Sequence, residues 1–141
     1  MGDRGNIIVL DQLRTPIFLY THWKGRYLPS ILQNALAKRC RWDDPSYLTR
    51  IIFCGMIKGY EEDSEGFGIS ASFEDNEHNY LFVDPRMREV RIIKKFSPSN
   101  CSSQSAVDIA IKQAAYSIPN MCLAKYSFEE FISLDVTKLK L

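Results

Sequence analysis

Segments with strand-like and helix-like patterns are grouped along the chain instead of alternating, and this grouping limits the fold more than any other feature. The apolar pattern predicts strands at 6–10, 16–22, 67–73, 79–84 and 89–95, and helices at 28–38, 46–58, 107–114 and 127–134. Parallel βαβ sheets need alternation, whereas runs of strands and runs of helices are typical of α+β folds. We therefore expect an α+β fold with a small antiparallel sheet of about five strands, two central helices and C-terminal helices.

Turn and cap residues at the ends of these segments support the assignment. Residues 11–15 separate the first two strands and predict a β-hairpin with a somewhat long turn. Asp44 followed by Pro45 is a helix start, because the carboxylate accepts from free N–H groups and proline fits the first helical position. Ser127 and Glu130 have the spacing of a capping box, which predicts that the last helix begins there.

Length and composition indicate one folded domain. The 141 residues are 45% hydrophobic and 25% charged, which is typical of a globular chain. We expect a single ligand-binding domain over 1–141, in which 97–125 is an inserted helical segment. A formal net charge of +1 argues against general nucleic-acid binding, although it still permits a small anionic ligand held by a few arginines.

Features of membrane, metal and secreted proteins are missing from the sequence. Its apolar runs are shorter than the roughly 20 residues that cross a bilayer, and its first residues lack the apolar core of a secretory signal. We therefore expect a cytosolic protein with no membrane partner. No zinc-ribbon spacing occurs among the cysteines, so we expect reduced thiols, no metal and no cofactor. These cysteines are Cys40, Cys54, Cys101 and Cys122.

Common catalytic motifs are also missing, which favours a binding protein over an enzyme. There is no P-loop, no Gly-x-Ser-x-Gly, no His-Glu-x-x-His and no Gly-x-Gly-x-x-Gly. The two histidines, His22 and His78, could combine with Glu77 and Asp84 as an acid–base cluster in a small nucleotide hydrolase. Alternatively, both are surface histidines at the ends of strands.

Aromatic side chains gather where the second strand ends. Tyr20, His22 and Trp23 place three flat rings within four residues. Aromatic rings stack on nucleic-acid bases with a gain of roughly 1–3 kcal/mol for each base. The same rings are equally suited to covering the edge of the core, so the sequence leaves both interpretations open.

Arg50 is flanked by apolar residues in the second helix. A guanidinium buried there needs an anion, because an unpaired buried charge is too costly. We expect an internal partner such as Asp43, and a ligand phosphate is the alternative. The apolar side of the same helix at 53–57 offers another possibility, which is an adaptor that binds a host protein.

Two short loops carry further candidate ligand-binding residues. Glycines bracket Phe67, and Gly68 permits close approach of a ligand to the backbone, although a bulge or turn explains the same pattern. Asn76 and Glu77 offer an amide and a carboxylate that could bind ribose hydroxyls, and solvated turn residues are the alternative.

Several strings of residues, taken in order, resemble a family of small phage and prophage proteins, the Thoeris anti-defence proteins of the first type. The resemblance covers most of 5–95 and returns at 126–135, whereas 97–125 fits least well. Each motif alone has low specificity, and the resemblance depends on their order along the chain. They are Phe18-Leu-Tyr-Thr-His-Trp23, Leu28-Pro29, Arg41-Trp-Asp43, Tyr47-Leu48, Arg50-Ile51, Gly66-Phe-Gly-Ile69, Asp75-Asn-Glu77, Val83-Asp84 and Ser127-Phe-Glu-Glu-Phe131.

The resemblance implies a function that composition does not. Such proteins are sponges that bind a cyclic ADP-ribose isomer, the signal of a bacterial TIR-domain enzyme, without cleaving it, and relatives are linked to cyclic oligonucleotides. It also implies a homo-oligomer in the cytoplasm of an infected bacterial host. Arg50 would then hold the pyrophosphate and an aromatic ring would stack on adenine. The candidate ligand-binding residues are Tyr20, His22, Trp23, Arg50, Phe67, Gly68, Asn76 and Glu77.

Overall fold

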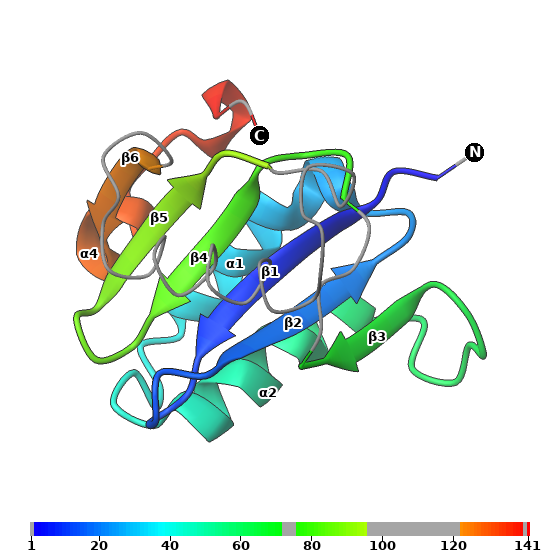
Figure 1. The fold of residues 1–141 in the computed structure, drawn as a ribbon, viewed down its shortest axis with the longest axis horizontal. Helices are drawn as coiled ribbons and strands as arrows, with labels where there is room; N and C mark the ends of the chain where they lie inside the picture. Colours follow the sequence, from blue (N-terminus) through cyan, green and yellow to red (C-terminus); the bar gives the residue numbers. More distant parts are fainter. Residues whose placement is uncertain (1, 72–75, 96–121, 140) are drawn as a thin grey trace, which may run out of the picture.

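The fold is built on a six-stranded sheet with the strand order β3-β2-β1-β4-β5-β6. Figure 1 presents it in the computed structural model, which describes residues 2–71, 76–95, 122–139 and 141. The predicted hairpin of the first two strands is confirmed, since β1 pairs antiparallel with β2, and β4 pairs antiparallel with β5. The strands are β1 (Gly5–Leu10), β2 (Pro16–Thr21), β3 (Phe67–Ser70), β4 (Tyr80–Asp84), β5 (Glu89–Ile93) and β6 (Cys122–Ser127).

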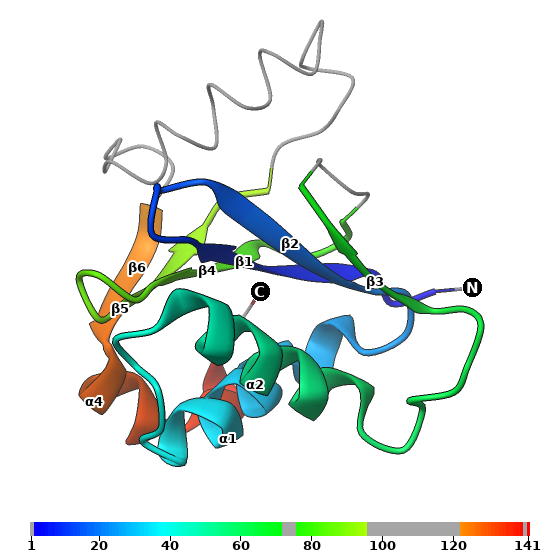
Figure 2. The same cartoon turned by 90° about the horizontal axis from the view of Figure 1, so that it is seen from below.

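The α-helices of the described residues cover one face of this sheet, as Figure 2 shows. This arrangement confirms an α+β fold in which a small sheet carries packed helices. No helix among the described residues has the length and apolar character needed to cross a bilayer. The helices are α1 (Leu28–Ala37), α2 (Pro45–Ile57) and α4 (Phe128–Ile132), with short 3-10 turns η1 (Gly25–Tyr27) and η3 (Val136–Lys138).

The expectation of a purely antiparallel sheet is wrong at one pair of strands. Strands β1 and β4 are parallel, with Val9 opposite Val83. Side chains alternate between the two faces in parallel and antiparallel strands alike, so alternation in the sequence does not reveal strand direction. Every residue of β1 is buried, as expected for a central strand with neighbours on both sides.

The sixth strand was not predicted, and it changes the boundary of the expected insertion. Strand β6 pairs antiparallel with β5, with Tyr126 opposite Val90, so 122–125 belong to the sheet and not to an inserted helix. The predicted helix at 107–114 lies outside the described residues. The capping box is confirmed, because the Glu130 N–H donates to Ser127 Oγ at 3.0 Å and the Ser127 N–H donates to Glu130 Oε1 at 3.0 Å.

The core lies between the sheet and the helices. On α2 the buried residues are Pro45, Leu48, Ile52 and Met56. Full burial of each of these large apolar side chains stabilises the fold by roughly 1.5–3 kcal/mol. Asp44 caps α2 as predicted, since its carboxylate accepts the Tyr47 N–H at 3.2 Å. Helix α2 therefore has a fixed start and one buried side.

Candidate functional site

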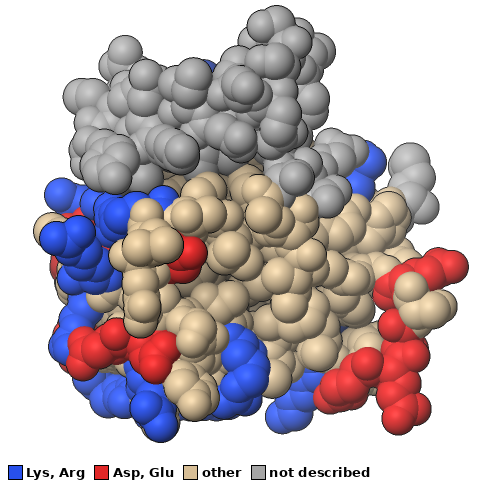
Figure 3. All heavy atoms as spheres, turned by 60° about the horizontal axis from the view of Figure 1, so that its bottom comes forward, with Lys and Arg blue, Asp and Glu red and all other residues tan. Residues whose placement is uncertain are grey.

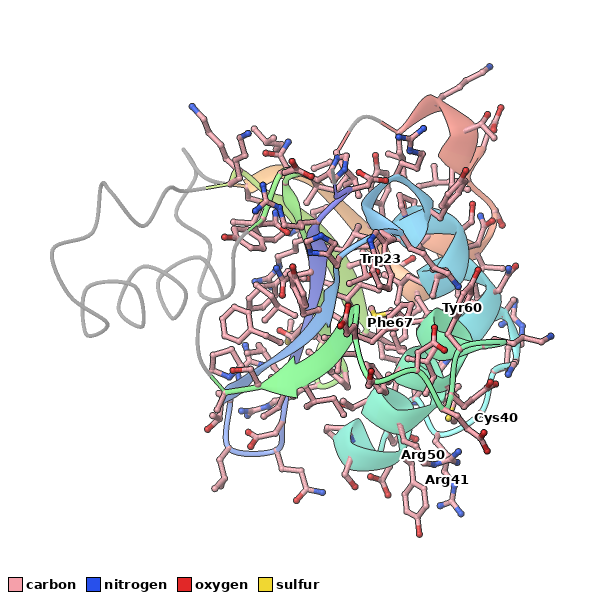
Figure 4. The ribbon with its side chains drawn as sticks, turned by 90° about the vertical axis from the view of Figure 1, so that its right-hand side faces the viewer. Trp23, Cys40, Arg41, Arg50, Tyr60 and Phe67 are labelled. Carbon is pink, nitrogen blue, oxygen red and sulfur yellow. The ribbon has the colours of Figure 1, made fainter. Side chains whose placement is uncertain are left out.

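A pocket lined mainly by aromatic rings lies at the C-terminal end of α2. It is formed by Trp23, Lys24, Tyr27, Tyr60 and Phe67 and has a volume of about 300 Å³. These residues come from the loop after β2, the η1 turn, the loop after α2 and the first position of β3. Figure 4 shows Trp23, Tyr60 and Phe67 gathered in one region. We call this site the aromatic pocket.

The rings in the aromatic pocket contact one another, and two of them remain partly exposed to solvent. Trp23 and Phe67 are T-shaped, with ring centroids 6.2 Å apart, and Tyr60 tilts against Phe67 at 5.8 Å. The Trp23 and Tyr60 side chains are 44% and 45% exposed. Edge and tilted contacts hold these rings in place, and their exposed parts are available to a flat ligand.

Lys24 adds a positive charge to the aromatic pocket. Its Nζ donates to the Met56 carbonyl at 3.1 Å and lies 4.5 Å from the centroid of the Tyr60 ring. The pKa of nearby Glu61 is lowered, first by its own backbone N–H, then by the Gly59 N–H, with smaller effects from the charges of Lys24 and Lys58. The pocket therefore combines partly exposed aromatic rings with an ammonium group held by a backbone carbonyl.

Gly66 fixes the position of Trp23. Its φ is +93°, and a β-carbon at this position would lie 1.9 Å from Trp23 Cζ3. The Gly66 carbonyl also accepts the His22 N–H at 2.8 Å. By contrast, a β-carbon at Gly68 would meet nothing within 4 Å. The close approach in this loop is therefore between the Gly66 backbone and the Trp23 ring. At Gly68, where a ligand was expected to approach, the surrounding space is open.

Tyr20 and His22 form a chain of contacts that leads to Trp23 but do not line the aromatic pocket. The Tyr20 hydroxyl lies 3.0 Å from His22 Nδ1. The His22 ring is T-shaped against Trp23, with centroids 5.4 Å apart. Of the sequence-predicted residues, only Trp23 and Phe67 line the pocket. Tyr20 and His22 lie behind Trp23 and support its ring.

The prediction of a buried Arg50 is wrong. Arg50 is exposed, and its guanidinium lies 3.9 Å from Cys54 Sγ. Asp43, the expected partner, instead pairs with Arg88. Successive helical residues turn by about 100°, so Arg50 lies on the side of α2 opposite the buried Leu48–Ile52 stripe. Arg50 lines neither this pocket nor the one described below.

Asn76 and Glu77 hold the N-terminal segment and do not line the aromatic pocket. The Arg4 N–H donates to Glu77 Oε2 at 2.8 Å, and the Arg4 guanidinium contacts Glu77 Oε1 at 3.2 Å. The backbone N–H of Arg4 is the main reason that the pKa of Glu77 is lowered. Asn6 Nδ2 donates to Asn76 Oδ1 at 3.1 Å. Both candidates are occupied by contacts within the chain.

The four residues of the hydrolase alternative are not brought together. His78 contacts Asp3 at 2.5 Å, whereas Asp84 is fully buried and paired with Arg14 at 2.7 Å. Asp84 ends β4 and His78 precedes its start, so the length of the strand, about 13 Å, separates them. Within the described parts of the chain, no three His, Cys, Asp or Glu residues are placed to hold a metal ion.

A second pocket lies at the N-terminal end of α2, and sequence reasoning did not identify it. It has a volume of about 590 Å³. Figure 3 shows many Lys and Arg side chains, with acidic side chains among them, at the end of the molecule that carries the α1–α2 connection. We call this site the arginine pocket. Its lining residues are Arg39, Arg41, Trp42, Asp43, Asp44 and Arg88.

Most of the aromatic pocket was also missed. Lys24, Tyr27 and Tyr60 follow no motif, and the only signal was that the two tyrosines lie in polar loops, where aromatic rings have little core to cover. Comparisons with protein-family models, curated proteins and solved structures found no match. Function is therefore inferred from the geometry of the two pockets and from the sequence motifs.

Proposed function

We propose that this protein is a phage-encoded anti-defence sponge that binds a cyclic ADP-ribose isomer and releases it uncleaved. The resemblance to first-type Thoeris anti-defence proteins suggests the ligand and its place of action, the cytoplasm of an infected bacterium. The observation that supports this proposal is the aromatic pocket, in which partly exposed aromatic rings lie beside the Lys24 ammonium. Removing the signal from solution would then keep Thoeris immunity inactive.

The aromatic pocket supplies the contacts that such a ligand needs. Trp23 or Tyr60 would stack on adenine, and each stacked ring contributes roughly 1–3 kcal/mol. Lys24 takes the role that the sequence suggested for Arg50, because its ammonium is the positive charge beside these rings and can meet the pyrophosphate. Nanomolar binding needs about 12 kcal/mol, so the ligand must make several such contacts at once.

Sequestration is supported better than hydrolysis. A sponge needs tight binding and slow release, whereas a hydrolase needs groups arranged around a transition state. His22, His78 and Asp84 have separate partners in the structure, namely Tyr20, Asp3 and Arg14. A binding role requires none of them to meet.

The size of the aromatic pocket favours an assembly of several copies. Its volume of about 300 Å³ is at the lower end for small-molecule sites, so a ligand with a base, two riboses and a pyrophosphate would extend beyond it. A second copy of the chain would cover the exposed remainder of the cyclic ADP-ribose isomer. We propose a homo-oligomer for this reason, and an assembly of this kind would also extend the site toward cyclic oligonucleotides.

The adaptor alternative has less support. It required an exposed apolar side on α2 at 53–57, but Phe53 is partly buried against the core. Cys54 is exposed, and a β-carbon at Gly55 would lie 3.7 Å from Ile31 Cγ2. This side of α2 therefore offers little apolar surface to a protein partner.

The proposal is tested by recovering the ligand after binding. Purified protein is mixed with a cyclic ADP-ribose isomer, filtered to remove free ligand and heat-denatured, and the released material is identified by mass spectrometry. We expect intact ligand in amounts stoichiometric with protein. Fragments would favour the hydrolase, and an absence of retained ligand would overturn the proposal.

A pair of variants shows whether the aromatic pocket is the site. Trp23→Ala removes a ring from the pocket, and Tyr47→Ala removes a similarly exposed ring at the other end of α2. We expect Trp23→Ala to weaken binding by about 10- to 100-fold, the loss of one stacked base. Tyr47→Ala should retain the affinity of the unaltered protein, and equal losses in both variants would place the site elsewhere.

A further inference from the structure

We infer that the arginine pocket is a second ligand site, which binds a small phosphoanion such as phosphate or pyrophosphate. This site is separate from the aromatic pocket. Asp43 and Asp44 precede α2, whereas Tyr60 follows it. With 13 residues, α2 is about 20 Å long, so one small ligand cannot fill both pockets. The inference therefore does not depend on the function proposed above.

Two guanidinium groups are held on the ring of Trp42. The Cζ atoms of Arg39 and Arg88 lie 5.5 Å and 5.8 Å from the ring centroid. Trp42 is itself fixed, because its Nε1 donates to the Leu36 carbonyl at 3.1 Å and its ring packs against Phe128. A guanidinium fork held on an aromatic ring presents its remaining N–H groups in a defined direction, which suits phosphate oxygens.

The backbone of the arginine pocket is strained at the arginines themselves. Arg39, Arg41 and Arg88 have φ values of 53°, 60° and 52°, in the left-handed region that glycine adopts far more readily. Arg39 follows the end of α1 and Arg88 closes the turn before β5, two places where glycine is the usual residue. Residues with strained backbones cluster at ligand sites, so three such arginines around one pocket suggest that their side chains bind a ligand.

The present partners of these arginines are easily exchanged. Arg39 pairs with Glu129 at 2.6 Å and Arg88 pairs with Asp43, but all four side chains are more than half exposed. Exposed ion pairs contribute little free energy and exchange readily with other anions. Among the described residues Arg41 has no acidic partner and stacks on Tyr47 at 4.5 Å.

Two carboxylates oppose an anion in this pocket, and their contacts show how it would still bind. Asp44 is occupied as the cap of α2, accepting the Tyr47 N–H and the Ser46 hydroxyl. The side chain of Asp43 is 81% exposed and can turn into solvent when Arg88 is released to the ligand. A phosphoanion carries more charge than one carboxylate and can bridge several guanidiniums, so it competes effectively.

The chain has two tryptophans, one in each pocket, and this permits a site-specific test. In Trp23→Phe the remaining indole is Trp42, whose fluorescence reports on the arginine pocket. We expect a saturable change on titration with pyrophosphate at constant ionic strength, and no change with adenosine. A response equal to that of sodium chloride at the same ionic strength would overturn the inference.

Variants of the arginines in the same background complete the test. Arg88→Gln and Arg41→Gln should each weaken pyrophosphate binding about tenfold or more, as expected for loss of charge-assisted hydrogen bonds. Arg86→Gln is the matched control, because Arg86 is exposed in the same turn as Arg88 but does not line the pocket. Equal affinities in the control and both test variants would overturn the inference, and thermal unfolding shows whether each variant is folded.

The source of the phosphoanion is distinguished by a third titration. The same protein is titrated with ADP, which carries the diphosphate on a nucleoside. An affinity close to that for pyrophosphate would support a site for the free anion. Affinity at least tenfold greater for ADP would assign the site to the phosphates of a nucleotide. Binding of ADP that is unaffected by Arg88→Gln and Arg41→Gln would contradict the assignment of this pocket.

Discussion

Gly66 lies directly against the indole of Trp23, with no room for a side chain between them. A β-carbon on residue 66 would lie 1.9 Å from Trp23 Cζ3, and the φ of +93° is one that other residues rarely adopt. The loop that ends at β3 therefore depends on glycine to seat the ring. This contact links the backbone of one loop to the shape of the aromatic pocket.

The first prediction is that Gly66→Ala weakens both the fold and ligand binding. The left-handed backbone alone costs roughly 1–2 kcal/mol for a residue with a β-carbon, so the free energy of unfolding should fall by about that amount. Displacement of Trp23 should reduce affinity at least tenfold. Urea unfolding and ligand titration measure the two effects. Gly68→Ala is the control, because its β-carbon meets nothing within 4 Å, and the idea fails if the two variants behave alike.

The second prediction concerns the charge in the aromatic pocket. Lys24→Gln keeps a side chain that can donate to the Met56 carbonyl but removes the ammonium beside Tyr60 and Phe67. Affinity for a pyrophosphate-bearing ligand should fall about tenfold at low salt and become less dependent on ionic strength. Isothermal titration at several salt concentrations tests this. Lys58→Gln removes a nearby exposed charge that does not line the pocket, and a matching loss there would rule out a specific role for Lys24.

Local features of the fold could be predicted because their causes lie within a few residues. Asp44 caps α2 through a hydrogen bond to a residue three positions later, and Ser127 and Glu130 cap α4 over the same distance. The pairing of β1 with β4 has no such signal, since it joins strands more than 70 residues apart. Strand β6 alternates half-buried and exposed residues and lacks a continuous apolar run, so it was missed.

The site was predicted only where aromatic residues stood out in the sequence. Trp23 and Phe67 were identified from their flanking residues and do line the aromatic pocket. The prediction for Arg50 considered its apolar neighbours and ignored helical phase, which turns it away from the buried stripe. Tyr60 and Lys24 meet only because the end of α2 returns to the loop after β2, which is a long-range result of packing.

The third prediction concerns the buried ion pair at the end of β4. Asp84 is fully buried and accepts a hydrogen bond from Arg14 at 2.7 Å, with Arg91 at 3.8 Å. Asp84→Asn would remove the buried anion that pairs with Arg14, whereas Arg91 would keep its closer partner Glu89 at 2.8 Å. Because the Arg14 charge would then lie beside a buried neutral amide, the free energy of unfolding should fall by about 3 kcal/mol or more. Asp43→Asn, in an exposed pair with Arg88, should change it by less than about 1 kcal/mol. Chemical unfolding compares them, and a small effect at Asp84 would contradict the assigned pairing.

A group of ionisable residues fastens the N-terminal segment to the loop before β4. Asp3 accepts from the Arg26 N–H and contacts His78, while Glu77 accepts from the Arg4 N–H. Burial raises the pKa of Asp3, but the hydrogen bonds from Arg26 and His78 together outweigh this and lower it. The pKa of Glu77 is lowered mainly by the Arg4 N–H. Both carboxylates are therefore bound more strongly when ionised.

The last prediction is that this fastening is lost in acid. A lowered pKa in the folded state contributes stability above the unfolded values, 3.8 for Asp3 and 4.5 for Glu77. That contribution disappears as the pH falls through the lower folded values, because the carboxylates then bind protons. The contribution of these two carboxylates to the free energy of unfolding should be constant from pH 7 to 5 and decline below about pH 4.5. Glu77→Gln should make this decline in the free energy of unfolding less steep. Glu62→Gln, which changes an exposed carboxylate in the acidic loop, should leave the decline unchanged. Identical pH profiles for both variants would mean that Glu77 does not hold the N-terminal segment.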